Sequence, residues 1–175
     1  MGSQSKLSVL LTRAEIEAKV DELATKIRRD YLGKHPLLIC VLKGSFMFIA
    51  DLIRRLNFPL EIDFIQLSSY GREKESSGKI KVMLGLRSPV KGRHILVIED
   101  VVDTGNTIAF LMDYLRKKKP ASLKLCALAD KPSRRQVPVT IDYLGFTVPN
   151  KFIVGYGIDW DEKFRYLPDI CALED

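Results

Sequence analysis

Three carboxylates follow an apolar run in the stretch ILVIEDVVDTGNT, residues 95–107. Glu99 and Asp100 end the run, and Asp103 comes three residues later. In an open parallel sheet, ligands bind outside the carboxyl ends of the strands, where a strand over this run would deliver the two adjacent acids. Carboxylates at that point suit a ligand that brings hydroxyl groups, a metal ion or a basic atom.

The turn after the acids has the composition of an anion site. It reads DTGNT and leads directly into a segment with helical spacing. Free backbone N–H groups and the positive end of a helix dipole bind phosphate at such a point, where Thr104 and Thr107 add hydroxyl donors and Gly105 permits close approach. A sugar phosphate with free hydroxyls satisfies both the turn and the acids. The structural alternative is Asp103 as a helix N-cap beside two solvated acids.

Helices and strands that alternate along the chain must position these residues. Thr12 and Glu15 form a capping box at the start of an amphipathic helix over residues 12–31. Two more helices are expected over residues 107–118 and on the spacing of Phe46, Ile49, Ile53 and Leu56. Strands are expected over residues 36–42, 60–67, 79–86, 94–99, 122–129 and 139–146. This alternation, with nearly continuous apolar strands, predicts one α/β domain over residues 1–175 with a parallel sheet covered on both faces.

Residues 68–79, SSYGREKESSGK, carry small and charged side chains without apolar periodicity. Loops of this length are uncommon in compact domains unless they have a role. We expect a long mobile loop that is either a hairpin tip or a lid over a binding site.

Composition is typical of a soluble globular protein. Of the 175 residues, 46% are hydrophobic and 29% are charged. The longest apolar stretch, residues 36–53, is interrupted by KGS and is too short to span a membrane. Cys40, Cys126 and Cys171 are expected as buried thiols in a reducing cytoplasm, because they have no paired spacing.

The charge of the chain leaves two kinds of partner open. A formal net charge of +6 permits nucleic acid or small phosphates. The run RKKK at residues 116–119 is interpreted as a solvated helix end rather than a binding patch, since cations there complement the helix dipole. His35 and His94 lack the spacing of metal ligands, so no metal site is expected from them.

The stretch VIEDVVDTGNT resembles the phosphoribosyl pyrophosphate signature of the type I phosphoribosyltransferases. LKGS, SSYG, DKPSRR, KFIVGYGIDW and FRYLP occur in the order expected of the hypoxanthine-guanine branch, and the match looks closest to its bacterial members. The resemblance implies a type I phosphoribosyltransferase fold, with a central parallel sheet flanked by helices, a small hood from the N- and C-terminal segments, and a flexible loop.

The same resemblance implies a reaction in cytoplasmic purine salvage. Hypoxanthine or guanine and 5-phosphoribosyl 1-pyrophosphate yield a nucleoside monophosphate and pyrophosphate, with Mg²⁺. It also implies a homodimer or homotetramer, without a nucleic-acid or membrane partner.

Roles for the acids and the turn follow from this resemblance. Glu99 and Asp100 are expected to hold the ribose 2- and 3-hydroxyls and part of the magnesium shell. Asp103 is expected to face N7 of the purine as the general base. The residues expected to wrap the 5-phosphate are Asp103, Thr104, Gly105, Asn106 and Thr107.

The resemblance places a second group of residues at the leaving pyrophosphate. Lys43 and Gly44 resemble the pyrophosphate loop, whose peptide before the lysine can be cis, so a cis bond between Leu42 and Lys43 is a hypothesis. Arg165 is expected to meet the pyrophosphate. Asp159 resembles the direct ligand of a second Mg²⁺, which typically takes one or two carboxylates plus substrate phosphates.

A third group is expected at the base. Lys131 should donate to the purine 6-oxygen and so exclude 6-amino purines, which offer no acceptor there. Phe152 should stack on the ring, and Ile153 should offer backbone groups to the base edge.

Ser69 and Tyr70 favour the lid interpretation of residues 68–79, because in the family this loop closes over the reaction centre and excludes water. Trp160 departs from the tyrosine that is more frequent in the family, and the effect on local packing and base affinity stays open.

Other functions remain as alternatives. A xanthine-guanine or orotate phosphoribosyltransferase is disfavoured by the match of KFIVGYGID. RNA-binding regulators of pyrimidine genes share the fold and the signature, and a basic chain would suit them. Residues 131–159 match the salvage enzymes instead, and no stripe of Lys and Arg with interleaved aromatics occurs.

Overall fold

A computed structural model describes residues 6–69 and 80–174. The larger sheet has the strand order β4-β3-β2-β5-β6-β7, and the smaller has the order β1-β9-β8. The larger sheet contains β2 (Leu37–Leu42), β3 (Glu61–Ser69), β4 (Ile80–Leu84), β5 (His94–Val102), β6 (Ser122–Asp130) and β7 (Tyr143–Thr147). The smaller contains β1 (Lys6–Leu11), β8 (Ile153–Val154) and β9 (Ile170–Glu174). The helices are α1 (Arg13–Tyr31), α2 (Phe46–Leu56), α3 (Asn106–Arg116) and the short 3-10 helix η1 (Pro132–Arg134).

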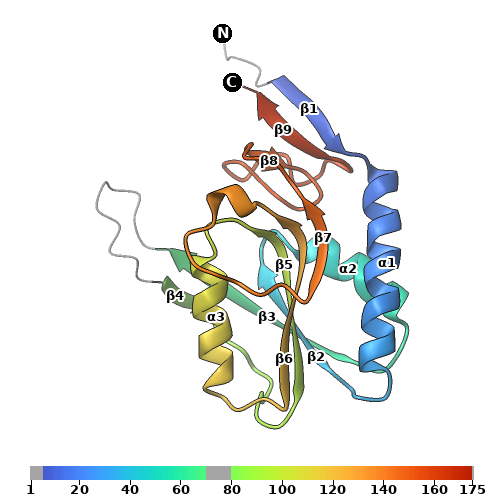
Figure 1. Cartoon of the computed structure of the whole chain (residues 1–175), viewed down its shortest axis with the longest axis vertical. Coiled ribbons are helices and arrows are strands. Elements are labelled where there is room, and N and C mark those ends of the chain that lie inside the picture. The colour runs from blue at the N-terminus through green and yellow to red at the C-terminus, as the bar shows by residue number, and fades with distance from the viewer. Residues whose placement is uncertain (1–5, 70–79, 175) are drawn as a thin grey trace.

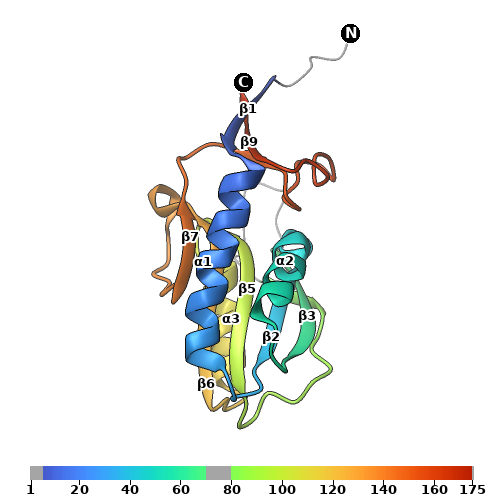
Figure 2. The same cartoon turned by 90° about the vertical axis from the view of Figure 1, so that its right-hand side faces the viewer.

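Helices cover both faces of the larger sheet, as the sequence predicts. Figure 2 shows α1 and α2 on one face and α3 on the other. Residues of β2 alternate between two cores, because successive side chains of a strand point to opposite faces. Leu38 and Cys40 pack with α1 and α2, whereas Leu37, Ile39 and Val41 pack on the side of α3.

The strands of the larger sheet are parallel except at one edge. β2, β3, β5, β6 and β7 pair in parallel, whereas β4 pairs antiparallel with β3. An antiparallel neighbour needs no crossover helix, and residues 70–79, between these strands in sequence, have no helical pattern. Ser68 and Ser69, expected at the start of the loop, belong to β3. Of the predicted mobile loop, residues 70–79 lie outside the described residues.

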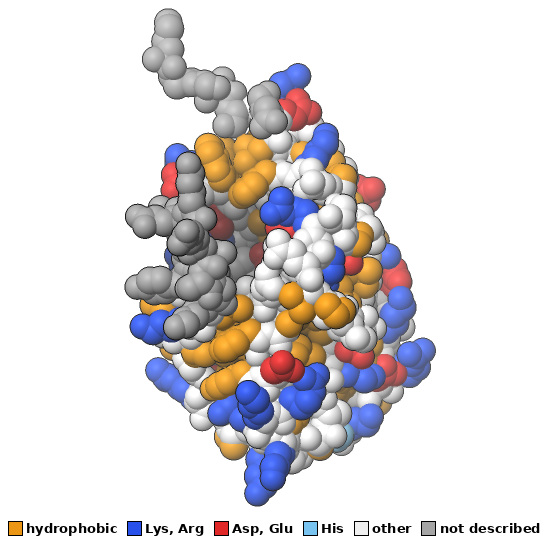
Figure 3. Space-filling view, turned by 60° about the vertical axis from the view of Figure 1, so that its left-hand side comes forward, with side chains coloured by type: hydrophobic (Ala, Val, Ile, Leu, Met, Phe, Trp, Pro, Cys, Tyr) orange, Lys and Arg blue, Asp and Glu red, His pale blue; other side chains and the backbone are white. Residues whose placement is uncertain are grey.

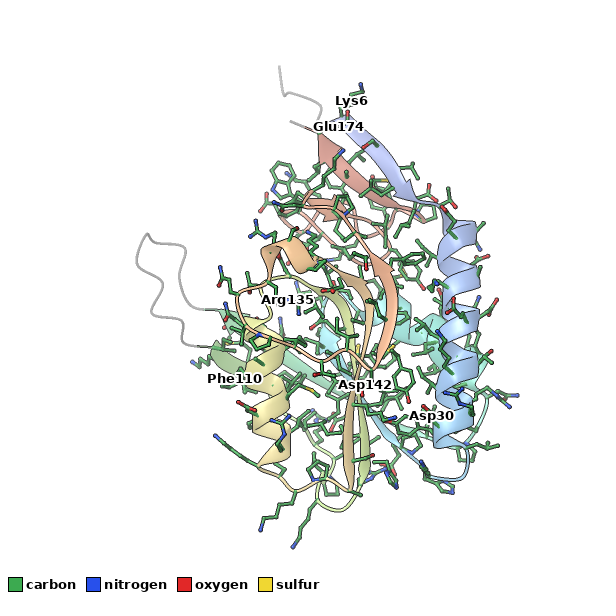
Figure 4. All side chains as sticks on the ribbon, in the orientation of Figure 1. Lys6, Asp30, Phe110, Arg135, Asp142 and Glu174 are labelled. Atoms are coloured by element: carbon green, nitrogen blue, oxygen red, sulfur yellow. The ribbon has the colours of Figure 1, made fainter. Side chains whose placement is uncertain are left out.

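The strand predicted over residues 139–146 is shorter in the structure, because β7 begins only at Tyr143. Val139 and Ile141 instead pack against the core on the side of α3, and the Asp142 side chain accepts a hydrogen bond from the Leu125 N–H (2.9 Å) just before β7 begins (Figure 4).

The helix expected on the spacing of Phe46, Ile49, Ile53 and Leu56 is confirmed as α2. Its buried residues are Phe48, Ile49, Leu52 and Leu56. Phe46 is exposed at the first helical position, and Ile53 is only partly buried. Apolar residues surround most of this helix, so periodicity alone predicts the helix but does not define its buried face.

Several local predictions are confirmed. Thr12 and Glu15 form the capping box, with the Thr12 N–H donating to Glu15 Oε2 at 2.8 Å. Cys40, Cys126 and Cys171 are buried free thiols. Residues 116–119 are exposed at the end of α3. Among the described residues, no helix is long and apolar enough to cross a membrane.

The smaller sheet joins the two ends of the chain above the larger one. Figure 1 shows β1, β9 and β8 beyond the carboxyl ends of the parallel strands. β1 pairs antiparallel with β9, and β9 pairs antiparallel with β8. Because of this arrangement, residues 148–169 lie over the carboxyl end of β5, where Glu99 and Asp100 are.

Candidate active site

The two adjacent acids lie near the carboxyl end of the central strand β5. The strand continues to Val102, three residues beyond the predicted end, so Glu99 and Asp100 are part of it. Glu99 is only 6% exposed, and the Asp100 N–H donates to its Oε1 at 3.0 Å. Burial, together with the neighbouring Asp100 carboxyl, raises the pKa of Glu99 well above its ordinary value. Among the described residues, no cationic side chain forms an ion pair with either of these crowded carboxyl groups, an arrangement that suits a metal ion or ribose hydroxyls.

The turn between β2 and α2 touches these acids. A Cβ at Gly44 would lie 1.7 Å from Asp100 Oδ2, so the turn approaches the carboxylate as closely as only glycine permits. The peptide bond between Leu42 and Lys43 is cis, which is the hypothesised geometry. On the other side, a Cβ at Gly157 would lie 2.5 Å from the Gly44 carbonyl oxygen. Three segments far apart in sequence therefore meet at Gly44.

The predicted phosphate turn opens α3. Gly105 is its N-cap with φ of +89°, a left-handed conformation that glycine adopts without strain. A cavity of about 90 Å³ lies between this turn and the end of β5. Its lining residues are Glu99, Val101, Val102, Asp103, Thr104, Gly105, Thr107 and Ile108. The cavity thus combines one buried carboxyl with the free N–H end of a helix, as an anionic sugar would require.

A segment that the sequence reasoning missed supports this turn. The Gln136 N–H donates to the Thr104 carbonyl oxygen at 2.8 Å, and Asn106 Nδ2 donates to Gln136 Oε1 at 2.9 Å. Asn106 therefore braces the turn through its side chain. Gln136 has no motif around it that predicts this contact.

Asp103 is engaged in an ion pair. Its Oδ1 accepts a hydrogen bond from Arg134 Nε at 2.7 Å, and both side chains are about half exposed. Arg134 was not among the predicted site residues, although it lies in the DKPSRR segment with Lys131. The pair lies at the mouth of the site, and a base that engages Asp103 must share or displace the Arg134 guanidinium.

The predicted base-binding residues lie together. Lys131 is 7% exposed, and its Nζ lies 6.0 Å from the centroid of the Phe152 ring, which is 54% exposed. Burial lowers the pKa of Lys131, while the nearby Asp103 carboxylate opposes that shift. A solvent-exposed aromatic ring beside a buried ammonium suits a flat ligand that carries an acceptor oxygen.

The backbone of Ile153 faces away from the smaller sheet. β8 is its edge strand, and the Leu173 N–H donates to the Phe152 carbonyl oxygen at 2.9 Å. Bonded and non-bonded positions alternate along an antiparallel pair, so the next residue, Ile153, directs its N–H and C=O to the free edge. This orientation matches the expectation that Ile153 presents backbone groups to a base.

The predicted pyrophosphate residues form one ionic cluster. Lys43 Nζ donates to Glu162 Oε1 at 2.8 Å. Arg165 contacts Asp159 Oδ1 at 3.0 Å, Glu162 Oε2 at 3.2 Å and the Gly157 carbonyl oxygen at 2.8 Å. Glu162 is a residue that sequence reasoning missed, because an acid in an acidic loop carries no signal of its own.

Magnesium fits the two predicted positions unequally. In the part of the chain that the structure describes, no cation pairs with the Glu99 or Asp100 carboxyl, whereas Asp159 is held by Arg165 and by the Glu162 N–H at 2.8 Å. In residues 6–69 and 80–174, no group of three or more potential ligands converges on one point. Such a partial set agrees with a metal that takes one or two carboxylates and completes its shell with substrate phosphates.

The lid residues and Trp160 remain predictions. Tyr70 lies outside the described residues, as does the side chain of Ser69. Trp160 is partly exposed, and its ring lies 5.7 Å from Lys163 Nζ, a local contact within the same turn.

Comparison with known proteins gives a consistent family. The family model "Phosphoribosyl transferase domain" matches residues 8–161. The hypoxanthine-guanine phosphoribosyltransferase of Bacillus subtilis is 44% identical over 166 residues, which cover 95% of this chain and 92% of that protein. A crystal structure of the hypoxanthine-guanine phosphoribosyltransferase of Bacillus anthracis is similar with a TM-score of 0.91 and 45% identity, and covers 98% of this chain and 100% of that one.

Some relatives are much longer. The bifunctional protein TilS/HprT of Listeria monocytogenes is 44% identical over 166 residues, but this chain spans only 26% of its length.

Proposed function

This chain belongs to the phosphoribosyl transferase family and, within it, to the hypoxanthine-guanine phosphoribosyltransferases, and from this membership we propose its reaction. It transfers the 5-phosphoribosyl group of 5-phosphoribosyl 1-pyrophosphate to N9 of hypoxanthine or guanine, with release of pyrophosphate, and so serves purine salvage. One observation supports this most: an acid pair, an anion-binding turn and a buried lysine beside an exposed aromatic ring surround the carboxyl end of β5.

The acids suit the charge that develops in this reaction. Displacement at the anomeric carbon passes through an oxocarbenium-like state, in which the ribose gains positive charge and the pyrophosphate gains negative charge. Glu99 and Asp100, near the end of β5, stabilise the positive charge on the ribose. Lys43 and Arg165 stabilise the negative charge on the pyrophosphate. Asp103 accepts the N7 proton as N9 attacks, a contribution of about 10² to 10⁴ in rate.

The base is selected by Lys131 and held by two neighbours. Its ammonium donates to a 6-oxygen, and a 6-amino purine would leave this buried donor without an acceptor. Phe152 stacks on the ring, which is worth about 1 to 3 kcal/mol per base. The free backbone edge of Ile153 contacts the side of the base.

We further propose that Mg²⁺ takes part through Glu99, Asp100 and Asp159. When bound, it neutralises charge on the pyrophosphate and orients the leaving group. Asp159, which pairs with Arg165 in this structure, would share its carboxylate between the guanidinium and the metal.

An oligomer in the cytoplasm is part of the same proposal. Three free thiols fit a reducing compartment. The face on the side of β4 and α3 carries a group of hydrophobic side chains (Figure 3), and Met83 and Leu84 of β4 are exposed there. A homodimer or homotetramer would cover such a surface, and light scattering after size-exclusion chromatography measures the mass.

Initial rates test the reaction. Phosphoribosyl pyrophosphate and Mg²⁺ are supplied with hypoxanthine, guanine, xanthine, adenine or orotate in turn. Turnover with hypoxanthine or guanine but not adenine is expected, and the ratio of kcat/KM values ranks the two bases. Preference for xanthine or orotate would replace this proposal with another transferase, and no turnover with any base would direct the next test to RNA binding.

A further inference from the structure

Glu162 joins the two cations expected to meet the pyrophosphate. Its Oε1 accepts from Lys43 Nζ at 2.8 Å, and its Oε2 lies 3.2 Å from Arg165 Nη2. The two oxygens of one carboxylate thus engage two cations from segments more than a hundred residues apart. A bridging anion between two cations is the arrangement that a diphosphate would adopt.

The backbone holds Glu162 in this position. Gly157 touches the Gly44 carbonyl, so the loop that carries Glu162 lies directly on the turn that carries Lys43. Glu162 itself has a positive φ of 61°, and the preceding Asp161 has one of 52°. Non-glycine residues rarely adopt this conformation, and the tight two-residue turn between the paired residues Trp160 and Lys163 requires it at both central positions.

The two cations depend on Glu162 to different extents. Arg165 is also held by Asp159 and by the Gly157 carbonyl oxygen, so it keeps its place without Glu162. Glu162 is the only side chain within the described residues that is hydrogen-bonded to the Lys43 ammonium. The main effect of the Glu162 carboxylate is therefore to neutralise Lys43 and Arg165, and it is not needed to hold Arg165 in position.

We propose that Glu162 is an intramolecular competitor of pyrophosphate. The inference rests on the proposed function, which assigns Lys43 and Arg165 to the leaving group. The carboxylate occupies both cations in the unliganded protein, and a diphosphate has to displace it. After displacement, Glu162 can return to the cations as pyrophosphate leaves, which limits product retention.

The test compares pyrophosphate binding by two isosteric variants. Glu162→Gln removes the bridging charge, and Asp161→Asn removes one charge from the neighbouring residue, whose carboxylate forms an ion pair with Lys163 at 3.6 Å. Isothermal titration calorimetry with sodium pyrophosphate is performed in magnesium chloride and again in EDTA. Both side chains are largely exposed, so both variants are expected to fold.

Glu162→Gln is expected to bind pyrophosphate roughly three- to tenfold more tightly than the wild type in both buffers, because each exposed ion pair contributes modestly. The pyrophosphate affinity of Asp161→Asn is expected to stay within about twofold of the wild type. This variant alters only a weak, long-range interaction with the ligand. Equal or weaker binding by Glu162→Gln would overturn the inference and make Glu162 a support for the cations. A gain seen only with magnesium would also overturn it, by assigning Glu162 to the metal through Asp159.

Transferase rates separate this inference from the proposed function. Turnover with hypoxanthine together with unchanged pyrophosphate affinity in Glu162→Gln would refute only the role of Glu162. Absence of both turnover and pyrophosphate binding in all three proteins would refute both.

Discussion

Replacing Gly44 by alanine tests whether the turn after β2 positions the acids of β5. A Cβ at this position would lie 1.7 Å from Asp100 Oδ2 and 2.6 Å from its Cγ. Gly44 is not among the glycines with positive φ, so alanine can adopt the same backbone conformation. The strain therefore falls on the Asp100 carboxylate, which is the flexible end of a side chain.

The size of the effect follows from that distance. Ordinary contact starts near 3.4 Å, so Asp100 Oδ2 has to move by roughly 1.7 Å, the difference between 3.4 and 1.7 Å. Overpacking of this kind costs about 1 to 3 kcal/mol, and a rotating side chain places the result at the lower end. A displacement of about 1 Å in a reacting constellation costs about 10² in rate. We expect kcat/KM for phosphoribosyl pyrophosphate to fall at least about 10²-fold, with about 1 to 2 kcal/mol lost in stability.

The assay measures initial rates together with urea denaturation. Gly85→Ala is the matched control, because the nearest described atom to its new Cβ would be Val82 Cγ1, at 4.0 Å. The control should keep wild-type rates. If Gly44→Ala keeps kcat/KM within about threefold of the wild type, or loses activity only in proportion to its unfolded fraction, the reasoning is wrong.

Three further predictions concern single side chains. Asp103→Asn should lower kcat about 10²- to 10⁴-fold while phosphoribosyl pyrophosphate binding, measured by calorimetry, is largely retained; an equal loss of both would assign Asp103 to the phosphate turn. Lys131→Ala should reduce the ratio of kcat/KM for hypoxanthine over adenine, and an unchanged ratio would remove its role in base selection. Asp63 is buried and accepts hydrogen bonds from three backbone N–H groups at 2.7 to 2.8 Å. Burial raises its pKa, but these bonds outweigh burial and hold the pKa below its ordinary value of 3.8. The unfolded chain therefore takes up the proton first, and the stabilisation is present above pH 3.8 and lost as the pH falls through the folded-state pKa. Asp63→Asn should cost about 1.5 to 3 kcal/mol at pH 7 in urea denaturation, and a difference that did not shrink at pH 3 would contradict this account.

Local signals in the sequence were sufficient for much of the site. A capping box depends on two side chains three residues apart, and the strand, turn and helix around residues 95–116 depend on contiguous apolar and glycine positions, so both could be predicted. The phosphoribosyltransferase signature named the family for the same reason, because its residues are contiguous. Glu99 and Asp100 accordingly lie in β5, and Lys131 directly follows β6.

Contacts between distant segments were decided only by the tertiary structure. Periodicity could not choose the buried stripe of α2, because apolar residues lie on most of its sides and only packing against the sheet selects one. Arg134 and Glu162 are ordinary surface charges in the sequence, and their pairing with Asp103 and with Lys43 and Arg165 arises from loops that the sheet brings together. The sequence by itself determined which groups are present and on which local elements they lie. Which charges neutralise one another before a substrate arrives depends on distances across the fold, which no local pattern encodes.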